Sequence, residues 1–148
     1  MNDPGKAKPP YRGSCLCGAV AYEFDALSEK IGHCHCSMCR KFHGAAFATL
    51  GEVAITDFRW TQGESELRSY AADNGTVRRF CGHCGASMSF EMASHPELIE
   101  IALGTLNTDI PYQPDVHIFT EFKSSWYTIK DGLPQFKQHR NGARQTDA

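Results

Sequence analysis

Short runs of alternating apolar and polar residues recur along most of this chain. Alternation with a period of two is typical of β-strands, and glycine-, asparagine- or aspartate-rich turns separate the runs. The pattern predicts a strand at 11–24 with a tight feature at Gly18. Further strands are predicted at 47–55, 58–63, 66–71, 76–81, 86–92, 98–106, 116–122 and 124–129. The runs 66–71 and 76–81 should pair across the Asp-Asn-Gly turn at 73–75. The chain is therefore expected to be mainly β.

One stretch departs from this alternation. Residues 37–43 predict a short helix, with Ser37 as its N-cap and Gly44 as its C-terminal stop. A chain of 148 residues has the size of one average domain. We expect that domain at 11–137, between a flexible N-terminal tail at 1–10 and a C-terminal tail at 138–148, because both ends are polar.

The net charge of the chain and its hydrophobicity exclude some classes of binding partner. A formal net charge of -2 gives no basic surface of the kind that binds nucleic acid. No apolar run approaches the ~20 residues that span a membrane, and the N-terminus lacks an apolar signal core. We therefore expect no nucleic-acid partner, no membrane partner and a cytoplasmic location. Thiols stay reduced in the cytosol, where clustered cysteines favour metal over disulfides.

The seven cysteines fall into three close groups. An odd number in two pairs and a triplet is a poor disulfide framework. The groups are Cys15 and Cys17, then Cys34, Cys36 and Cys39, and finally Cys81 and Cys84. Metal binding is the interpretation that this spacing favours.

The two pairs suit one structural zinc, which four thiolates close. On a strand, Cys15 and Cys17 would project to one face. Cys81 and Cys84 lie in CGHCG, which resembles a zinc knuckle whose glycines allow a sharp turn. One zinc would clamp the first strand to the later hairpin. Free buried thiols, or a redox role for Cys81 and Cys84, are the alternatives, although no βαβ pattern surrounds that pair.

The triplet has one ligand fewer. Cys34 and Cys36 lie in an extended lead-in, and Cys39 falls in the first turn of the predicted helix, which favours a thiolate. Three thiolates leave the fourth position on zinc open, as in catalytic or ligand-binding sites. Water, a substrate thiol or a neighbouring histidine could fill that position.

The order and spacing of all seven cysteines resemble the glutathione-dependent formaldehyde-activating enzyme family, which includes the centromere protein V type of domain. The resemblance runs from about Gly13 to Phe136 through GSCLCGAVAYE, CHCSMCRKFHG, RRFCGHCGASM, GTL at 104–106, HIF at 117–119 and DGLPQF at 131–136. It implies a β-tent fold of small antiparallel sheets with one short helix, built around zinc sites. It also implies two zincs per chain, one structural on the two cysteine pairs and one catalytic-type on the triplet. Asn107 stands where the family often has an acidic residue.

This resemblance implies a carbon–sulfur lyase that acts on a thiol–aldehyde adduct such as S-hydroxymethylglutathione. Substrate thiol or water would occupy the open three-cysteine zinc. The partner would then be a small-molecule thiol or thiol–aldehyde adduct. A non-catalytic zinc module that only binds glutathione or another thiol is the alternative, and a scaffold role is the third hypothesis.

Three further residues are candidates for catalysis. Arg40 could meet a substrate carboxylate with its planar fork, although an exposed basic residue explains it equally well. His35, between two cysteines, could assist a substrate or a sulfur. His117 could move a proton at physiological pH, but a strand residue bonded to backbone is at least as good an interpretation.

Overall fold

A computed structural model of the chain describes residues 7–145. The chain divides into two compact units, which we call unit 1 (residues up to 29 together with 51–113) and unit 2 (residues 30–50 and from 114 onward). Residues 1–6 and 146–148 of the predicted tails lie outside the described residues. None of the helices within 7–145 is long and apolar enough to span a membrane.

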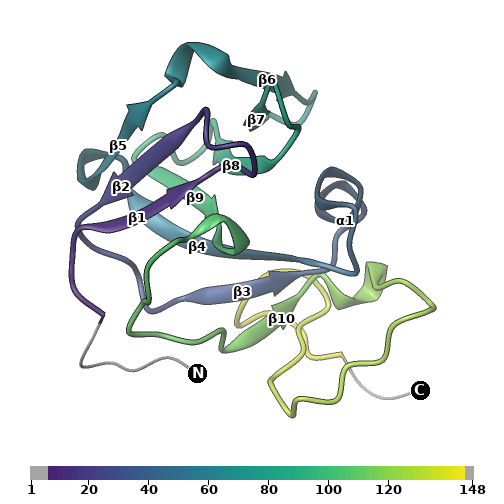
Figure 1. Cartoon of the computed structure of the whole chain (residues 1–148). Helices are drawn as coiled ribbons and strands as arrows, with labels where there is room; N and C mark the ends of the chain where they lie inside the picture. The colour runs from purple at the N-terminus through teal and green to yellow at the C-terminus, as the bar shows by residue number, and fades with distance from the viewer. Residues whose placement is uncertain (1–6, 146–148) are drawn as a thin grey trace. The chain divides into compact units, whose positions relative to one another are not determined.

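The described residues are mainly β, as predicted (Figure 1). The strands are β1 (Tyr11–Ser14), β2 (Ala21–Phe24), β3 (Ile31–Cys34), β4 (Ala48–Ala54), β5 (Phe58–Gln62), β6 (Leu67–Ala71), β7 (Thr76–Cys81), β8 (Ser87–Met92), β9 (Leu98–Ala102) and β10 (Val116–Ile118). Between residues 7 and 145 the single α-helix is α1 (Ser37–His43), which confirms the predicted helix. Short 3-10 turns occupy Ile55–Asp57, Glu64–Glu66, Leu103–Thr105 and Thr120–Phe122.

Unit 1 contains two sets of strands. β1, β2 and β5 form a three-stranded antiparallel sheet, with Tyr11 opposite Phe24 in its first pair. The second set follows the order β9-β8-β7-β6, in which neighbouring strands are antiparallel. The predicted hairpin of 66–71 with 76–81 is confirmed, because β6 and β7 pair with Leu67 opposite Cys81.

An aromatic cluster surrounds the buried Tyr22 in unit 1. Tyr22 is buried and its ring stacks against Phe58 at 5.5 Å and meets Trp60 edge-on at 6.0 Å. Its hydroxyl lies 2.8 Å from Thr105 Oγ1, which ties β2 to the turn after β9. Position 13 needs glycine because a Cβ there would collide with the Tyr22 hydroxyl. Full burial of one such ring is worth about 1.5–3 kcal/mol.

The predicted strand at 11–24 is wrong as a single element. β1 ends at Ser14 and β2 begins at Ala21, and the residues between them form a turn. The backbone reverses because Gly18 adopts a φ of +83°, which other residues rarely reach. Cys15 and Cys17 therefore lie in this turn and not on one face of a strand.

Unit 2 is built on a parallel pair of strands. β10 pairs with β3 in parallel, with His117 opposite His33 and Ile118 opposite Cys34. This pair is a local exception to the small antiparallel sheets that the resemblance implies. Parallel neighbours require a long connection, and these two strands are separated by most of the chain. Helix α1 follows β3 after two residues.

The end of the described chain also differs from expectation. Residues 124–129 form no strand, because the Lys123 ammonium donates to the carbonyls of Ser124 and Tyr127 and holds them in a turn. The segment 138–145, expected as a tail, is hydrogen-bonded: the N–H of Lys137 donates to Ala143 at 2.8 Å.

Candidate metal centres

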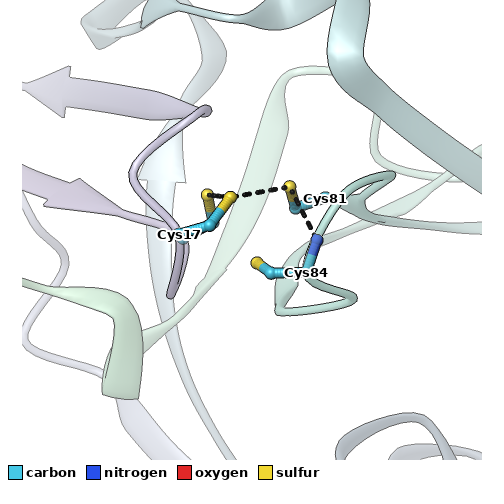
Figure 2. Close-up of side chains that lie close together, drawn as sticks. Cys17, Cys81 and Cys84 are labelled. Atoms are coloured by element: carbon cyan, nitrogen blue, oxygen red, sulfur yellow. Dashed lines mark hydrogen bonds between the residues drawn. The ribbon is translucent and has the colours of Figure 1, made fainter.

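The four cysteines of the two pairs lie together in unit 1. Their sulfur atoms are all within 4.8 Å of one another, and we call them the four-cysteine cluster: Cys15, Cys17, Cys81 and Cys84. Sγ of Cys17 is 3.7 Å from that of Cys15. It is 3.8 Å from that of Cys81, and Figure 2 shows these two sulfurs facing each other. Zn–S bonds of about 2.3 Å in a tetrahedron separate the sulfurs by about 3.8 Å. The cluster therefore fits a four-thiolate zinc.

Two turns of similar design bring these sulfurs together. In each turn the N–H of the first cysteine donates at 3.0 Å to the carbonyl five residues later, Cys15 to Val20 and Cys81 to Ala86. In each turn the glycine after the second cysteine has a positive φ, +83° at Gly18 and +77° at Gly85. Because glycine reaches this conformation without a steric cost, it can follow both cysteine pairs.

Backbone N–H groups point at the sulfurs. The N–H of Val20 lies 3.3 Å from Cys15 Sγ, and that of His83 lies 3.4 Å from Cys81 Sγ. Hydrogen bonds from the N–H groups of Ala86 and Cys17 lower the pKa of Cys84 to about 6. These donors stabilise thiolates, the form of cysteine that binds zinc.

The remaining cysteines form a second group in unit 2. The sulfurs of Cys34, Cys36 and Cys39 lie within 4.8 Å of one another, and we call them the three-cysteine cluster. Cys34 ends β3, and Cys36 is the N-cap of α1, where its sulfur accepts from the N–H of Cys39 at 3.3 Å. The predicted N-cap, Ser37, is one residue too late, because the sulfur of Cys36 already accepts that bond. Gly44 ends the helix as predicted, with a φ of +60°.

Three thiolates this close repel one another when no cation is present. The side chains of Cys36 and Cys39, together with burial, raise the pKa of the Cys34 thiol far above its ordinary value. A divalent cation reverses this effect, since a coordinating thiol is deprotonated. The donor set of the three-cysteine cluster therefore fits a zinc with three thiolate ligands and one further position.

The structure brings His35 and His117 together. His35 is fully buried, and its Nε2 lies 2.7 Å from Nδ1 of His117. His117 is also buried, and its Nε2 lies 2.8 Å from Oδ2 of Asp131. Nδ1 of His35 is buried and has no hydrogen-bond partner. The three side chains thus form one chain of hydrogen bonds that ends at an unused nitrogen.

Aromatic rings and positive charges both surround His35. Its ring lies 5.0 Å from that of Phe47 and 6.4 Å from that of Tyr127. Burial first, and then the charges of neighbours that include Lys123 and Arg40, lower the pKa of His35 to about 4. The imidazole is therefore neutral near pH 7.

The third predicted residue, Arg40, lies on α1 close enough for its charge to act on His35. Its Nε is buried and has no hydrogen-bond partner. A buried guanidinium nitrogen of this kind can bind an anion. The structure is consistent with the predicted contact to a carboxylate, although the role of Arg40 stays a prediction.

Asp131 is the residue that the sequence analysis missed. His33, His117 and Asp131 have ligand atoms within 4.8 Å of one another, but the nitrogens of His117 already bond to His35 and Asp131. His33 Nδ1 is likewise 2.8 Å from Thr49 Oγ1. This group is therefore a hydrogen-bonded network. The only sequence signal was the acidic residue that opens DGLPQF.

Asn107 contacts β1 in unit 1, although it lies 93 residues after Ser14 in the sequence. Its side-chain amide donates to Ser14 Oγ at 2.9 Å, and its backbone N–H donates to the Arg12 carbonyl at 2.8 Å. These bonds hold the end of β1 just before Cys15. The residue thus supports the turn of the four-cysteine cluster.

Known proteins show the same relationship that the cysteine spacing indicates. The family model described as glutathione-dependent formaldehyde-activating enzyme matches residues 10–122. A Halomonas elongata protein, provisionally named a glutathione-dependent formaldehyde-activating enzyme, is 28% identical over 125 residues, 80% of each chain. An uncharacterized lyase of Schizosaccharomyces pombe is 28% identical over 133 residues, which is 83% of this chain and 94% of that protein.

A solved structure is similar to this chain in both fold and sequence. The crystal structure of a Rhodobacter sphaeroides protein matches with a TM-score of 0.58 and 28% identity. The match covers 65% of this chain and 87% of that one. The family match includes both cysteine clusters and His117 and ends before Asp131. The chain therefore belongs to the glutathione-dependent formaldehyde-activating enzyme family.

Proposed function

We propose that this protein is a zinc-dependent carbon–sulfur lyase that acts on a thiol–aldehyde adduct such as S-hydroxymethylglutathione. The observation that supports this most is the three-cysteine cluster, which has one ligand too few for a structural zinc. The buried His35 lies between two of its cysteines in the sequence. The family and the names of the relatives point to the same chemistry. We assign one zinc to each cluster.

The two clusters would have different tasks. Cys15, Cys17, Cys81 and Cys84 would hold a structural zinc with no free position. Cys34, Cys36 and Cys39 would hold the second zinc. When bound, that zinc would lower the pKa of a thiol placed at its fourth position.

His35 would transfer the proton as general base and general acid. Its unused Nδ1 would take the proton of the substrate thiol and later give it to the aldehyde oxygen. The thiolate sulfur would attack the carbonyl carbon, so that a C–S bond forms as the C=O π bond breaks. In the lyase direction the hydroxyl proton returns to His35, the C=O bond forms again and the thiolate leaves.

The positive side chains suit an anionic substrate. Arg40 would use its buried, unpaired Nε to bind a carboxylate of a glutathione-like molecule. The Lys123 ammonium, bonded to two backbone carbonyls, adds to the positive potential at His35. The rings of Phe47 and Tyr127 would help to keep water away from His35.

The test uses the full chain loaded with zinc, mixed with glutathione and formaldehyde. Adduct formation, followed by NMR, should exceed the spontaneous rate, and His35→Gln should lower the enzymatic rate by about 10²-fold or more. Lys8→Gln, a change on an exposed residue of unit 1, is the control and should leave the rate unchanged.

No acceleration by fully metallated protein would overturn the proposal for this substrate. Glutathione binding in calorimetry without any turnover would favour the alternative, a non-catalytic thiol-binding zinc module. Arg40→Gln should mainly raise KM, by about tenfold, since it removes a charged contact to the substrate.

A further inference from the structure

The hydrogen-bonded chain Asp131–His117–His35 has a direction that the donors and acceptors determine. We propose that Asp131 is a positioning residue that sets which nitrogen carries the proton in His117 and His35, and so leaves Nδ1 of His35 as a free lone pair. The catalytic use of this lone pair rests on the proposed function, whereas the positions of the protons can be tested without it.

The direction starts at the carboxylate. Burial opposes ionisation of Asp131, but hydrogen bonds from His117 and from the N–H of Leu133 outweigh it and lower the pKa of the carboxyl group. An ionised carboxylate only accepts hydrogen bonds. Because Oδ2 of Asp131 lies 2.8 Å from Nε2 of His117, that nitrogen must carry a proton.

The next bond follows from the first. An imidazole with one proton has one N–H and one lone pair, so a singly protonated His117 with its proton on Nε2 has a lone pair on Nδ1. A second proton on this ring would make Nδ1 a donor to His35 and would force the proton of His35 onto its buried, unpartnered Nδ1. Nδ1 of His117 lies 2.7 Å from Nε2 of His35, which must therefore donate. The lone pair of His35 is then on Nδ1, the nitrogen without a partner.

The opposite arrangement, with the proton on Nδ1 in both His117 and His35, is unfavourable at Asp131 and at His35. It would bring the lone pair of His117 Nε2 against the carboxylate lone pairs of Asp131 at 2.8 Å. It would also leave a buried N–H on His35 Nδ1 with no acceptor, and orphaned buried N–H groups are rare. The carboxylate therefore decides the proton positions of two histidines.

A second contact of Asp131 provides a sharp test. Its Oδ1 accepts from the N–H of Leu133 at 3.0 Å. In Asp131→Asn the amide oxygen must stay on Leu133, so that the amide NH₂ faces His117 and donates to Nε2. His117 would then carry its proton on Nδ1, and His35 would carry its own proton on Nδ1. One substitution of nearly equal size should thus reverse the whole chain.

The experiment labels the histidines of the full-length, zinc-loaded chain with ¹⁵N and records long-range ¹H–¹⁵N spectra near neutral pH. We expect His35 and His117 to have the proton on Nε2 in the wild type and on Nδ1 in Asp131→Asn. Glu121→Gln, an exposed carboxylate of the same unit that bonds to Gln138, is the matched control and should change neither ring.

A wild-type His35 with its proton on Nδ1 would overturn the proposal, whether or not the variant folds. An unchanged proton position in folded Asp131→Asn would also overturn it. If the wild type accelerates adduct formation, Asp131→Asn should lower kcat by about 10²-fold or more with little change in KM. If it does not accelerate the reaction, the proposed function fails while the spectra still test the proton positions.

Discussion

The two cysteine clusters differ most in the length of chain that they connect. The four-cysteine cluster joins the turn after β1 to the turn after β7, and Cys17 and Cys81 are 64 residues apart. The three-cysteine cluster comes from six consecutive residues, 34–39. A metal that bridges distant segments removes much conformational freedom from the unfolded chain, whereas a local one removes little. Stability should therefore depend on the first cluster far more than on the second.

The polar groups around the two clusters also indicate different roles. Backbone N–H groups of tight turns surround the four-cysteine cluster. Unit 2, which holds the three-cysteine cluster, also contains the buried imidazoles of His35 and His117. Burying polar side chains costs free energy, and proteins tend to accept that cost at functional sites. The comparison favours a structural role for the first cluster and chemistry at the second.

The largest effect should come from Cys81→Ser. Cys81 is fully buried and its sulfur accepts two backbone N–H groups, which hold it in place as a ligand. Structural zinc contributes about 10–16 kcal/mol in small zinc domains, as much as the whole stability of many proteins. We expect the variant to lose its cooperative thermal transition in calorimetry and its near-UV circular dichroism.

A smaller effect on folding should come from Cys39→Ser. Serine is nearly the same size and removes only one thiolate of a local cluster, so we expect a loss of about 1–2 kcal/mol and a folded chain. The zinc content found by metal analysis should fall from about two per chain to about one, and turnover should drop about 10²-fold or more. If Cys39→Ser is as damaging to the fold as Cys81→Ser, the division of roles is wrong.

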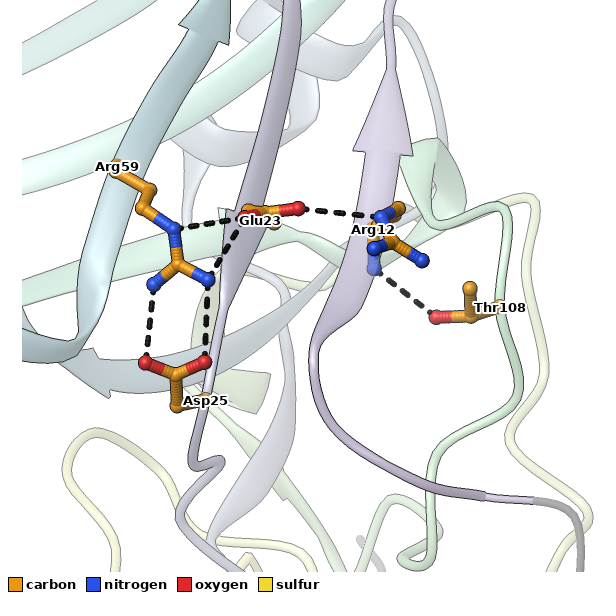
Figure 3. A network of polar contacts seen from close by, with 5 residues as sticks. All are labelled: Arg12, Glu23, Asp25, Arg59 and Thr108. Atoms are coloured by element: carbon orange, nitrogen blue, oxygen red, sulfur yellow. Dashed lines mark hydrogen bonds and ion pairs between the residues drawn. The ribbon is translucent and has the colours of Figure 1, made fainter.

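The smallest effect should come from the exposed charges of unit 1. Arg59 bonds to Glu23 at 2.8 Å and to both carboxylate oxygens of Asp25 at 2.9 and 3.1 Å, and Glu23 also pairs with Arg12 (Figure 3). Such exposed pairs add little stability, so Arg59→Gln should lower Tm only slightly. A loss comparable to that of Cys81→Ser would contradict the view that the cysteines stabilise unit 1.

The small loss of stability expected for Arg59→Gln should depend on pH in a defined direction. Hydrogen bonds from Arg59 lower the pKa of both Glu23 and Asp25 in the folded chain. Their stabilisation is therefore present above the ordinary carboxyl pKa of about 4 and disappears as the pH falls through the lowered values. The difference in Tm between Arg59→Gln and the wild type should be constant near neutral pH and vanish in acid.

Local spacing made several features predictable. Cys34, Cys36 and Cys39 lie in six residues, so their convergence needs only the end of a strand and one helical turn. Gly44 indicated the end of α1 because a left-handed residue stops a helix. At 15–20 the sequence indicated a tight feature at Gly18 but no break of the strand, because these residues are all apolar or glycine and continue the apolar pattern. Only the backbone bonds of this segment, such as that from Cys15 to Val20, reveal the reversal.

By itself, the sequence determined the mainly β class, the helix at 37–43 and the grouping of the seven cysteines. These depend on neighbours within a few residues, which sequence patterns record directly. Only the tertiary structure decided that Asp131, His117 and His35 form one chain. His35 and His117 are 82 residues apart, and they meet because β10 lies parallel to β3 in the register that sets Ile118 opposite Cys34. Strand register is a property of the folded sheet, and no local pattern in 34–39 specifies it.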